Sequence, residues 1–316
     1  MTAFFDTRLQ ALITLGEELR AENYCFTTVT PATHARVNSR PQNQVAEDLQ
    51  GVFGWSRLFP DAVISERMLA LLETGGLLQR EDSQWRSAVR WSSLGGQLFA
   101  HSAYPTLESD AVFFGPDTYR FAQALQRHFD SEPADSVRRA VDIGCGAGPG
   151  AILIAQAYPD AEVTAVDINP RALDFTRANA CLAGIDDLQI RQSNLLDAID
   201  GQFDLIVANP PYLLDPDERT YRHGGGDLGD GLSLRIVETA LERLAPGGSL
   251  LLYTGAAVVN GEAPLRRRLD ALLADRPVSW RYEEMDPDVF GEELECPAYQ
   301  QAERIAAVTL TMKRLG

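Results

Sequence analysis

Two patterns of hydrophobic and polar positions follow one another along the chain and change near residue 110. Apolar residues at helical spacing predict one amphipathic helix near the start, and these residues are Phe5, Leu9, Leu12, Ile13 and Leu19. The segment 65–73 predicts a short helix with Ser65 as its N-cap, and Gly75-Gly76 ends it. Residues 1–110 therefore read as a helical or mixed accessory domain.

A polar turn at 81–83 follows this helix and predicts a hairpin. Apolar residues at 77–78 precede the turn, and an alternating segment at 85–91 follows it. A helix followed by a hairpin is the outline of a winged helix. The hairpin carries three basic residues, which are Arg80, Arg86 and Arg90. These arginines would be able to contact an acidic partner, although a solvated strand face is the simpler interpretation.

Strands alternate with helices from about residue 135 onward. The predicted strands are 140–143, 162–166, 188–191, 203–208 and 249–253, followed by two more near 278–282 and 304–312. The predicted helices are 151–158, 170–183, 231–244 and 264–274. Because parallel strands need crossover connections, this alternation predicts a doubly wound α/β sheet in residues 111–316. Ligands of such sheets bind beyond the carboxyl ends of the strands.

Composition places the chain among globular proteins. Its 316 residues are 45% hydrophobic and 23% charged, enough for two domains of roughly 150 residues each. No run approaches the roughly 20 apolar residues of a membrane helix, and the first residues lack the pattern of a secretory signal. The four cysteines have no metal-ligand or disulfide-framework spacing. We therefore expect a cytoplasmic protein without a metal site or a membrane partner.

The charge balance bears on the partner. Residues 1–110 hold 13 acidic and 9 basic residues, and residues 111–316 hold 32 acidic and 19 basic residues. The net charges are therefore −4 and −13, which sum to the formal −17 of the chain. An acidic surface repels a phosphate backbone unless basic residues are clustered locally. This balance favours a protein partner over a nucleic acid.

A glycine-rich segment joins the first strand of the second part to its helix. It runs from Asp142 to Gly150 and includes Gly144, Gly146 and Gly148. Glycines there let the backbone turn tightly and approach a ligand closely. A dinucleotide fingerprint fits only in an offset register, and the Gly-Lys-Ser/Thr of a phosphate-binding loop is absent from the sequence.

Asp167 ends the next predicted strand, 23 residues after Gly144. A carboxylate at that place is able to accept hydrogen bonds from both hydroxyls of a ribose. A role as a helix N-cap is the alternative, but Asn169 is better placed for it.

The tetrapeptide Asn209-Pro210-Pro211-Tyr212 directly follows the apolar strand 203–208. A planar amide or aryl amine is a poor nucleophile because its lone pair is delocalised. If the Asn209 side-chain oxygen and the Pro210 carbonyl hold its two hydrogens, the nitrogen is aimed and its delocalisation is relieved in the transition state. Proline at both following positions fixes the carbonyl direction, and Tyr212 is able to stack on a flat acceptor.

Together, the glycine segment, Asp167 and the NPPY tetrapeptide resemble class I S-adenosylmethionine-dependent methyltransferases that act on planar nitrogens. The segments 224–227, 230–235 and 244–249 resemble in particular the HemK/PrmC-type protein glutamine methyltransferases. The resemblance implies a Rossmann-like sheet and S-adenosylmethionine as cofactor. The tetrapeptide is shared with adenine amino-methyltransferases of DNA or RNA, so it indicates the nitrogen chemistry and leaves the acceptor open.

The resemblance also assigns roles to individual residues. Catalysis falls to the tetrapeptide: Asn209 and Pro210 hold the acceptor, Pro211 keeps the carbonyl direction, and Tyr212 stacks. The cofactor-binding residues that it implies are Asp142, Gly144, Gly146, Gly148, Asp167, Asn194, Asn209 and Thr118. Asn194 stands where the family usually has an acidic residue near the adenine, and its side-chain oxygen is still able to accept from the adenine amino group. Tyr119 is a further candidate beside Thr118.

Three functions remain open from the sequence. They are a protein glutamine methyltransferase, a nucleic-acid adenine methyltransferase and a cofactor-binding protein that no longer catalyses. The intact tetrapeptide disfavours the third, and the charge balance favours the first over the second. Residues 1–110 do not match the helical substrate domain of release-factor methyltransferases, so the sequence leaves the physiological acceptor and the oligomeric state undetermined.

Overall fold

The computed structural model describes residues 6–133, 135–215, 219 and 221–316. A seven-stranded sheet forms its larger half, with the strand order β10-β11-β9-β8-β5-β6-β7. In chain order these strands are β5 (Arg139–Ile143), β6 (Glu162–Asp167), β7 (Gln189–Gln192), β8 (Phe203–Ala208), β9 (Leu244–Val258), β10 (Val278–Asp286) and β11 (Arg304–Arg314). Strands β5 to β9 pair in parallel.

Helices cover both faces of this sheet. Buried residues of α5 (Pro116–Ser131) and α6 (Pro149–Ala157) pack in one core, together with inward residues of the strands. Helices α8 (Gly231–Arg243) and α9 (Pro264–Leu273) pack in a separate core on the opposite face. The apolar strands are buried on both sides, as the central strands of such a sheet must be. The predicted doubly wound α/β sheet is confirmed.

Two features of the sheet differ from the sequence-based expectation. Strand β11 runs antiparallel to β9 and β10, between which it lies, so the sheet is mixed. Strand β9 begins five residues earlier than predicted, because residues 245–248 are part of the strand instead of a turn before it. It also ends five residues later than predicted. In addition, helix α5 was not predicted, and only Thr118 and Tyr119 of its residues were site candidates.

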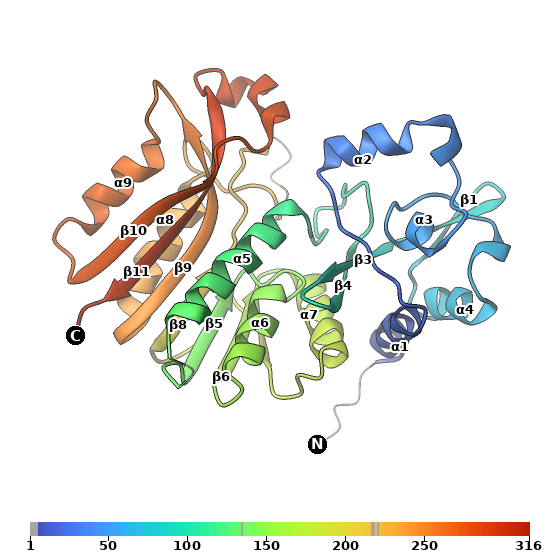
Figure 1. Ribbon diagram of the computed structural model, residues 1–316, viewed down its shortest axis with the longest axis horizontal. Coiled ribbons are helices and arrows are strands. Elements are labelled where there is room, and N and C mark those ends of the chain that lie inside the picture. The colour runs from blue at the N-terminus through green and yellow to red at the C-terminus, as the bar shows by residue number, and fades with distance from the viewer. Residues whose placement is uncertain (1–5, 134, 216–218, 220) are drawn as a thin grey trace.

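The first hundred residues form a smaller unit beside this sheet (Figure 1). Its helices are α1 (Thr7–Ala21), α2 (Pro31–Asn38), α3 (Leu49–Phe53) and α4 (Glu66–Thr74). Its strands form two hairpins, β1 (Leu78–Glu81) with β2 (Gln84–Ser87), and β3 (Val89–Leu94) with β4 (Gln97–Ser102). The side chain of Ser65 caps α4 by accepting from the Met68 N–H, as predicted.

The predicted single hairpin is therefore two hairpins, since Trp85 lies on β2 and Trp91 on β3. One of the three arginines on these strands does not lie on the surface as predicted. Arg90 is 5% exposed and donates from Nε to the Gly54 carbonyl at 2.9 Å. Arg86 pairs with Glu81, which leaves Arg80 as the exposed arginine of the three.

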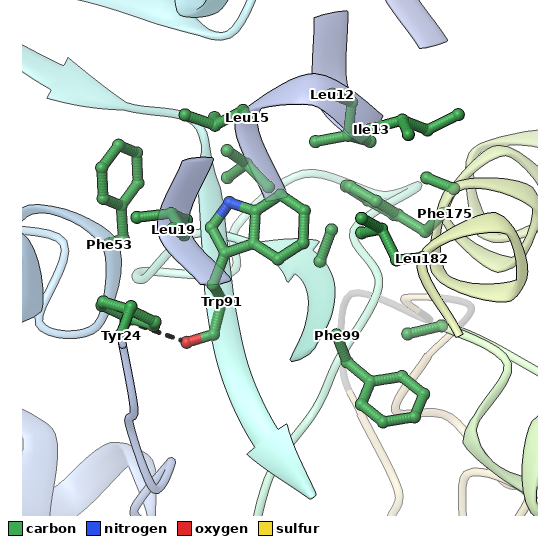
Figure 2. Packing of buried hydrophobic residues seen from close by; sticks show 14 of the residues in the cluster. Leu12, Ile13, Leu15, Leu19, Tyr24, Phe53, Trp91, Phe99, Phe175 and Leu182 are labelled. Atoms are coloured by element: carbon green, nitrogen blue, oxygen red, sulfur yellow. Dashed lines mark hydrogen bonds between the residues drawn. The ribbon is translucent and has the colours of Figure 1, made fainter. Parts of the chain in front are cut away.

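The smaller unit joins the sheet domain through a shared hydrophobic core. Figure 2 shows the indole of Trp91 between Leu15 and Leu19 of α1 on one side and Leu182 of helix α7 (Pro170–Leu182) on the other. Trp91 is completely buried. At Gly16 a side chain would lie 2.6 Å from both Trp91 and Leu182, so α1 approaches α7 as closely as it does only because this position is glycine.

We expect Gly16→Val to lower the free energy of unfolding by about 1–3 kcal/mol, the usual cost of overpacking a core. The valine side chain would force Trp91 or Leu182 from its place, which outweighs the gain of removing glycine from a helix interior. Urea denaturation measures this change. Gly291→Val is the matched control for added bulk, because a side chain at Gly291 meets no atom within 4 Å and its backbone does not have a positive φ. Equal stability of Gly16→Val and the wild type would contradict this role of Gly16.

Candidate active site

A cavity of about 220 Å³ opens at the carboxyl ends of β5, β6 and β8. All but one of the residues that the sequence assigned to the site line it, namely Thr118, Asp142, Gly144, Gly146, Asp167, Asn194, Asn209, Pro210, Pro211 and Tyr212. The exception is Gly148. It begins α6 with φ +84°, and a side chain there would lie 2.9 Å from Thr176, so its demonstrable role is to turn the chain into the helix.

Asp142 lies at the end of β5 and is 2% exposed. Its Oδ2 accepts from the Ala151 N–H in the first turn of α6 at 2.9 Å. A side chain at Gly150 would lie 2.6 Å from this oxygen, so glycine is required for the close approach of helix and strand. Burial raises the pKa of Asp142 to about 7, and Asp167 adds to the rise.

Asp167 ends β6, and its two oxygens accept from separate backbone groups. Oδ2 accepts from the Gly146 N–H at 3.0 Å, and Oδ1 accepts from the Asn169 N–H at 2.9 Å. Each carboxylate oxygen keeps a second lone pair for a ligand. Burial raises the pKa of Asp167 as well. Asn169 caps α7 through its own side chain, which leaves Asp167 available for the cavity.

Neither carboxylate has a basic partner in the part of the chain that the structure describes, and no basic residue influences the pKa of either one. Two buried acids beside one cavity favour a ligand that carries positive charge. They disfavour the diphosphate of a dinucleotide, which would bring negative charge to the same place.

The tetrapeptide leaves β8 and turns into the cavity. Asn209 is half-buried, and its side-chain amide has no hydrogen-bond partner among the described residues. The Pro210 carbonyl likewise accepts from no backbone or side-chain donor of that part of the chain. Two consecutive residues of the cavity wall therefore each carry an oxygen without an internal partner, which is what holding the two hydrogens of an amide or amine requires.

Tyr212 is held by a carboxylate that the sequence analysis missed. Asp117, 5% exposed in the first turn of α5, accepts from the Tyr212 and Tyr253 hydroxyls, each at 2.6 Å. Arg120 donates to Asp117 at 3.2 Å and to Asp286 at 2.7 Å. Burial raises the pKa of Asp117 in spite of these bonds. The sequence made Thr118 and Tyr119 site candidates, but nothing local distinguished Asp117 from its neighbours.

Thr118 and Asn194 line the cavity, and each already uses one of its side-chain hydrogen-bonding groups within the protein. The Thr118 hydroxyl accepts from the Gly115 N–H at 3.2 Å and so helps to begin α5. The Asn194 side chain is exposed and donates from Nδ2 to Asp197 at 3.2 Å, which leaves its oxygen available. The suggestion for Tyr119 is wrong, because Tyr119 packs against Phe114 and its hydroxyl accepts from the Thr28 N–H.

Acidic residues near the cavity are more fully paired than the sequence suggested. Asp215 is 3% exposed and accepts from Arg219 at 2.8 and 2.5 Å, and Arg222 pairs with both Asp215 and Glu293. Asp227 and Asp230 pair with Arg268. The repulsion of phosphates that the net charge of residues 111–316 predicts is therefore weaker at these acids than their number implies. In the acidic run 215–218, residues 216–218 lie outside the described part.

Two aromatic residues complete the cavity wall. Phe290, from the acidic segment 283–295, lines the cavity with its ring centroid 6.0 Å from that of Tyr212. No periodic pattern marks it, and it lies between the strands predicted near 278–282 and 304–312. Phe113 stacks on Tyr221 at 6.2 Å, and the Tyr221 hydroxyl donates to the Thr106 carbonyl at 2.7 Å. These contacts tie the loop after the tetrapeptide to the linker between the two units.

Comparison with known proteins agrees with this geometry. The family model described as the methyltransferase small domain matches residues 107–276. The release factor glutamine methyltransferase of Deinococcus radiodurans is 36% identical over 166 residues, which cover 49% of this chain and 55% of that protein. The ribosomal protein uL3 glutamine methyltransferase of Bordetella pertussis is 38% identical over 131 residues, 38% of this chain and 44% of that protein.

The release factor glutamine methyltransferase of Escherichia coli is 31% identical over 151 residues, 44% of this chain and 53% of that protein. The matched segments thus span about half the length of these curated relatives. None of the helices in the described ranges is long and apolar enough to cross a bilayer.

Proposed function

Because the chain belongs to the methyltransferase small domain family, we propose that it transfers a methyl group from S-adenosylmethionine to the side-chain amide nitrogen of a protein glutamine. The relatives named for glutamine methylation support the acceptor class. The observation that carries the proposal is the pair of unpartnered oxygens on Asn209 and Pro210 at the cavity wall. They are suited to hold the two hydrogens of one primary amide.

The cavity fits this cofactor. Its sulfonium supplies an already activated methyl group, so the chain has to bind, align and exclude water. Asp142 would hold the positively charged amino-acid end, near the backbone of Gly144 and Gly146, and Asp167 would hold the ribose. The absence of a basic partner for either acid within the described residues supports a cationic ligand. Asn194 and Thr118 remain candidates for the adenine and methionine ends.

The acceptor amide would lie against the tetrapeptide. Asn209 Oδ1 and the Pro210 carbonyl would accept one N–H each, which localises the lone pair of the nitrogen and points it toward the methyl group. The nitrogen would lose one of these two protons to solvent as the N–C bond forms and the bond from the methyl carbon to sulfur breaks. Pro211 restricts the backbone, and Tyr212, anchored by Asp117, closes one side. We propose that residues 1–110 recognise the acceptor protein and that residues 111–316 supply the catalytic and cofactor-binding side chains, although Pro31 and Thr106 also line the cavity. We also propose that the protein acts in the cytoplasm.

A methyl-transfer assay on fractionated cell extract tests the acceptor class. Radiolabelled methyl groups should survive nuclease treatment and disappear with protease. Complete enzymatic digestion should release methylated glutamine, and acid hydrolysis, which cleaves its side-chain amide, should release the label as methylamine. If the label is confined to nuclease-sensitive material, the acceptor is not a protein. It is then an adenine amino group of RNA or DNA, which the same tetrapeptide chemistry would accommodate.

Cofactor affinity should depend on pH through Asp142. With a pKa of about 7 in the free protein, Asp142 holds a proton in mildly acidic solution and must release it to bind a cation. The affinity should therefore fall by up to about tenfold per pH unit below pH 7, and binding should release up to one proton. Calorimetry in buffers of different ionisation enthalpy measures this release.

The control for this prediction is Asp142→Asn, whose side-chain oxygen is still able to accept from Ala151 N–H. This variant should bind more weakly, with an affinity that changes much less over the same pH range. A wild-type affinity that does not change between pH 5 and 8 would contradict the assignment of Asp142.

A further inference from the structure

A buried positive charge without a counter-ion lies next to the active-site cavity. The Arg90 guanidinium, on β3, has no carboxylate partner among the residues that the structure describes. Its contacts are the Gly54 carbonyl at 2.9 Å, the Thr28 hydroxyl at 3.5 Å and the ring of Phe26 at 5.8 Å. Arg120 and Arg222, which are more exposed, both pair with acids. An uncompensated buried charge is costly, so it calls for an anion.

Arg90 lines a second, small cavity together with two buried histidines. His34 is 1% exposed, its Nε2 lies 2.8 Å from the Trp55 carbonyl, and its Nδ1 has no partner in the described chain. The two ring nitrogens of His101 lie at hydrogen-bond distance from the Ser92 hydroxyl and the Ser102 carbonyl. Burial and Arg90 lower the pKa of both histidines, that of His34 to about 3, so Arg90 supplies the charge of this cavity.

The volume and the position of this small cavity restrict which ligand is able to bind in it. Its volume is about 10 Å³, which is room for one water-sized group and too little for a phosphate. It shares Pro31, Thr106 and Phe113 with the active-site cavity. Thr106 is also bonded to Tyr221 in the loop after the tetrapeptide. The small cavity therefore adjoins the acceptor side of the site.

We propose that this cavity is a carboxylate subsite, in which one carboxylate oxygen enters beside Arg90 and accepts from its guanidinium. A single unpaired guanidinium matches a single negative charge, and carboxylates are its strongest common partners. The carboxylate belongs either to the acceptor protein, close to the modified glutamine, or to a small free molecule. The first source rests on the proposed function, whereas binding of the carboxylate itself does not.

Thermal unfolding without cofactor tests the subsite, with sodium formate as the probe. A three-atom ligand binds no more tightly than about 1 mM, so the titration runs from 1 to 100 mM. We expect formate to raise the midpoint by a few degrees in the wild type and not in Arg90→Met. Arg86→Met is the matched control, because Arg86 also donates to a carbonyl but pairs with Glu81. It should respond to formate as the wild type does. Formamide, a neutral molecule of the same shape, should have no effect.

Two further measurements complete the test. In the wild type, formate should shift the ring resonances of His34 and His101 in a saturable way, a readout that does not depend on how the variants fold. Inhibition of methyl transfer by formate, in the wild type but not in Arg90→Met, would assign the carboxylate to the acceptor, and transfer unaffected by bound formate would assign it to a free molecule.

Absent or non-saturable shifts, equal protection by formamide, or unchanged protection in Arg90→Met would each overturn the subsite. None of these results would contradict the proposed methyl transfer, because none of these binding measurements involves the cofactor or the tetrapeptide.

Discussion

Replacing Asn209 by alanine is expected to lower the rate of methyl transfer by about 10²–10³-fold or more, while the dissociation constant of S-adenosylmethionine changes only a few fold. A loss of this size is expected when one group that hydrogen-bonds to the reacting nitrogen in the transition state is removed. The cofactor affinity should persist because Asn209 lies at the tetrapeptide end of the cavity, whereas Asp142 and Asp167 lie at the glycine segment.

Calorimetry and single-turnover transfer separate these two effects. Asn209→Asp is a second variant, since it keeps the size and one oxygen but adds a charge beside the acceptor. Loss of cofactor binding in Asn209→Ala, with the fold intact by circular dichroism, would show that Asn209 holds the donor and not the acceptor.

Asp117→Ala should affect both stability and transfer. It leaves the Tyr212 and Tyr253 hydroxyls and the Arg120 guanidinium without their shared acceptor, so the free energy of unfolding should fall by about 3–5 kcal/mol. The transfer rate should fall by at least about tenfold, because Tyr212 loses the contact that orients its ring. Urea denaturation and steady-state kinetics measure the two changes.

A double-mutant cycle with Tyr212→Phe separates positioning from bulk stability. If Asp117 acts through Tyr212, the double variant Asp117→Asn/Tyr212→Phe should transfer no more slowly than the slower single variant. Tyr253→Phe is the matched control, because it removes an equivalent 2.6 Å bond to the same carboxylate away from the cavity wall. Additive losses in the Asp117/Tyr212 cycle would contradict a positioning role.

Local signals in the sequence predicted most elements of the sheet domain to within a few residues. The strand at 203–208 was predicted without error, and the glycine segment and tetrapeptide came together at one cavity because both follow adjacent parallel strands. Such motifs need only chain order and strand direction to be placed. The order of β10 and β11 was not predictable in that way, since antiparallel pairing depends on which edge remains open.

The residues that the sequence did not reveal depend on contacts between distant segments. Asp117 is 95 residues from Tyr212 and 136 from Tyr253, and no periodicity links them. Arg90 alternates with apolar residues as an exposed strand residue would, yet α3, whose C-cap Gly54 accepts from it, and the ring of Phe26 bury it. Phe290 stands alone in an acidic segment, where an aromatic residue carries no pattern.

Trp91 has a consequence for how this protein could have diversified. Its indole is part of the same core as α7, the helix that begins three residues after Asp167, so the unit proposed to recognise the acceptor and the part of the sheet domain proposed to bind the cofactor share one set of packed side chains. The first hundred residues are therefore not a detachable adaptor. Exchanging them for the corresponding segment of a relative would expose α7, and a change of acceptor would have to arise by substitutions within this joint core instead of by recombination of modules.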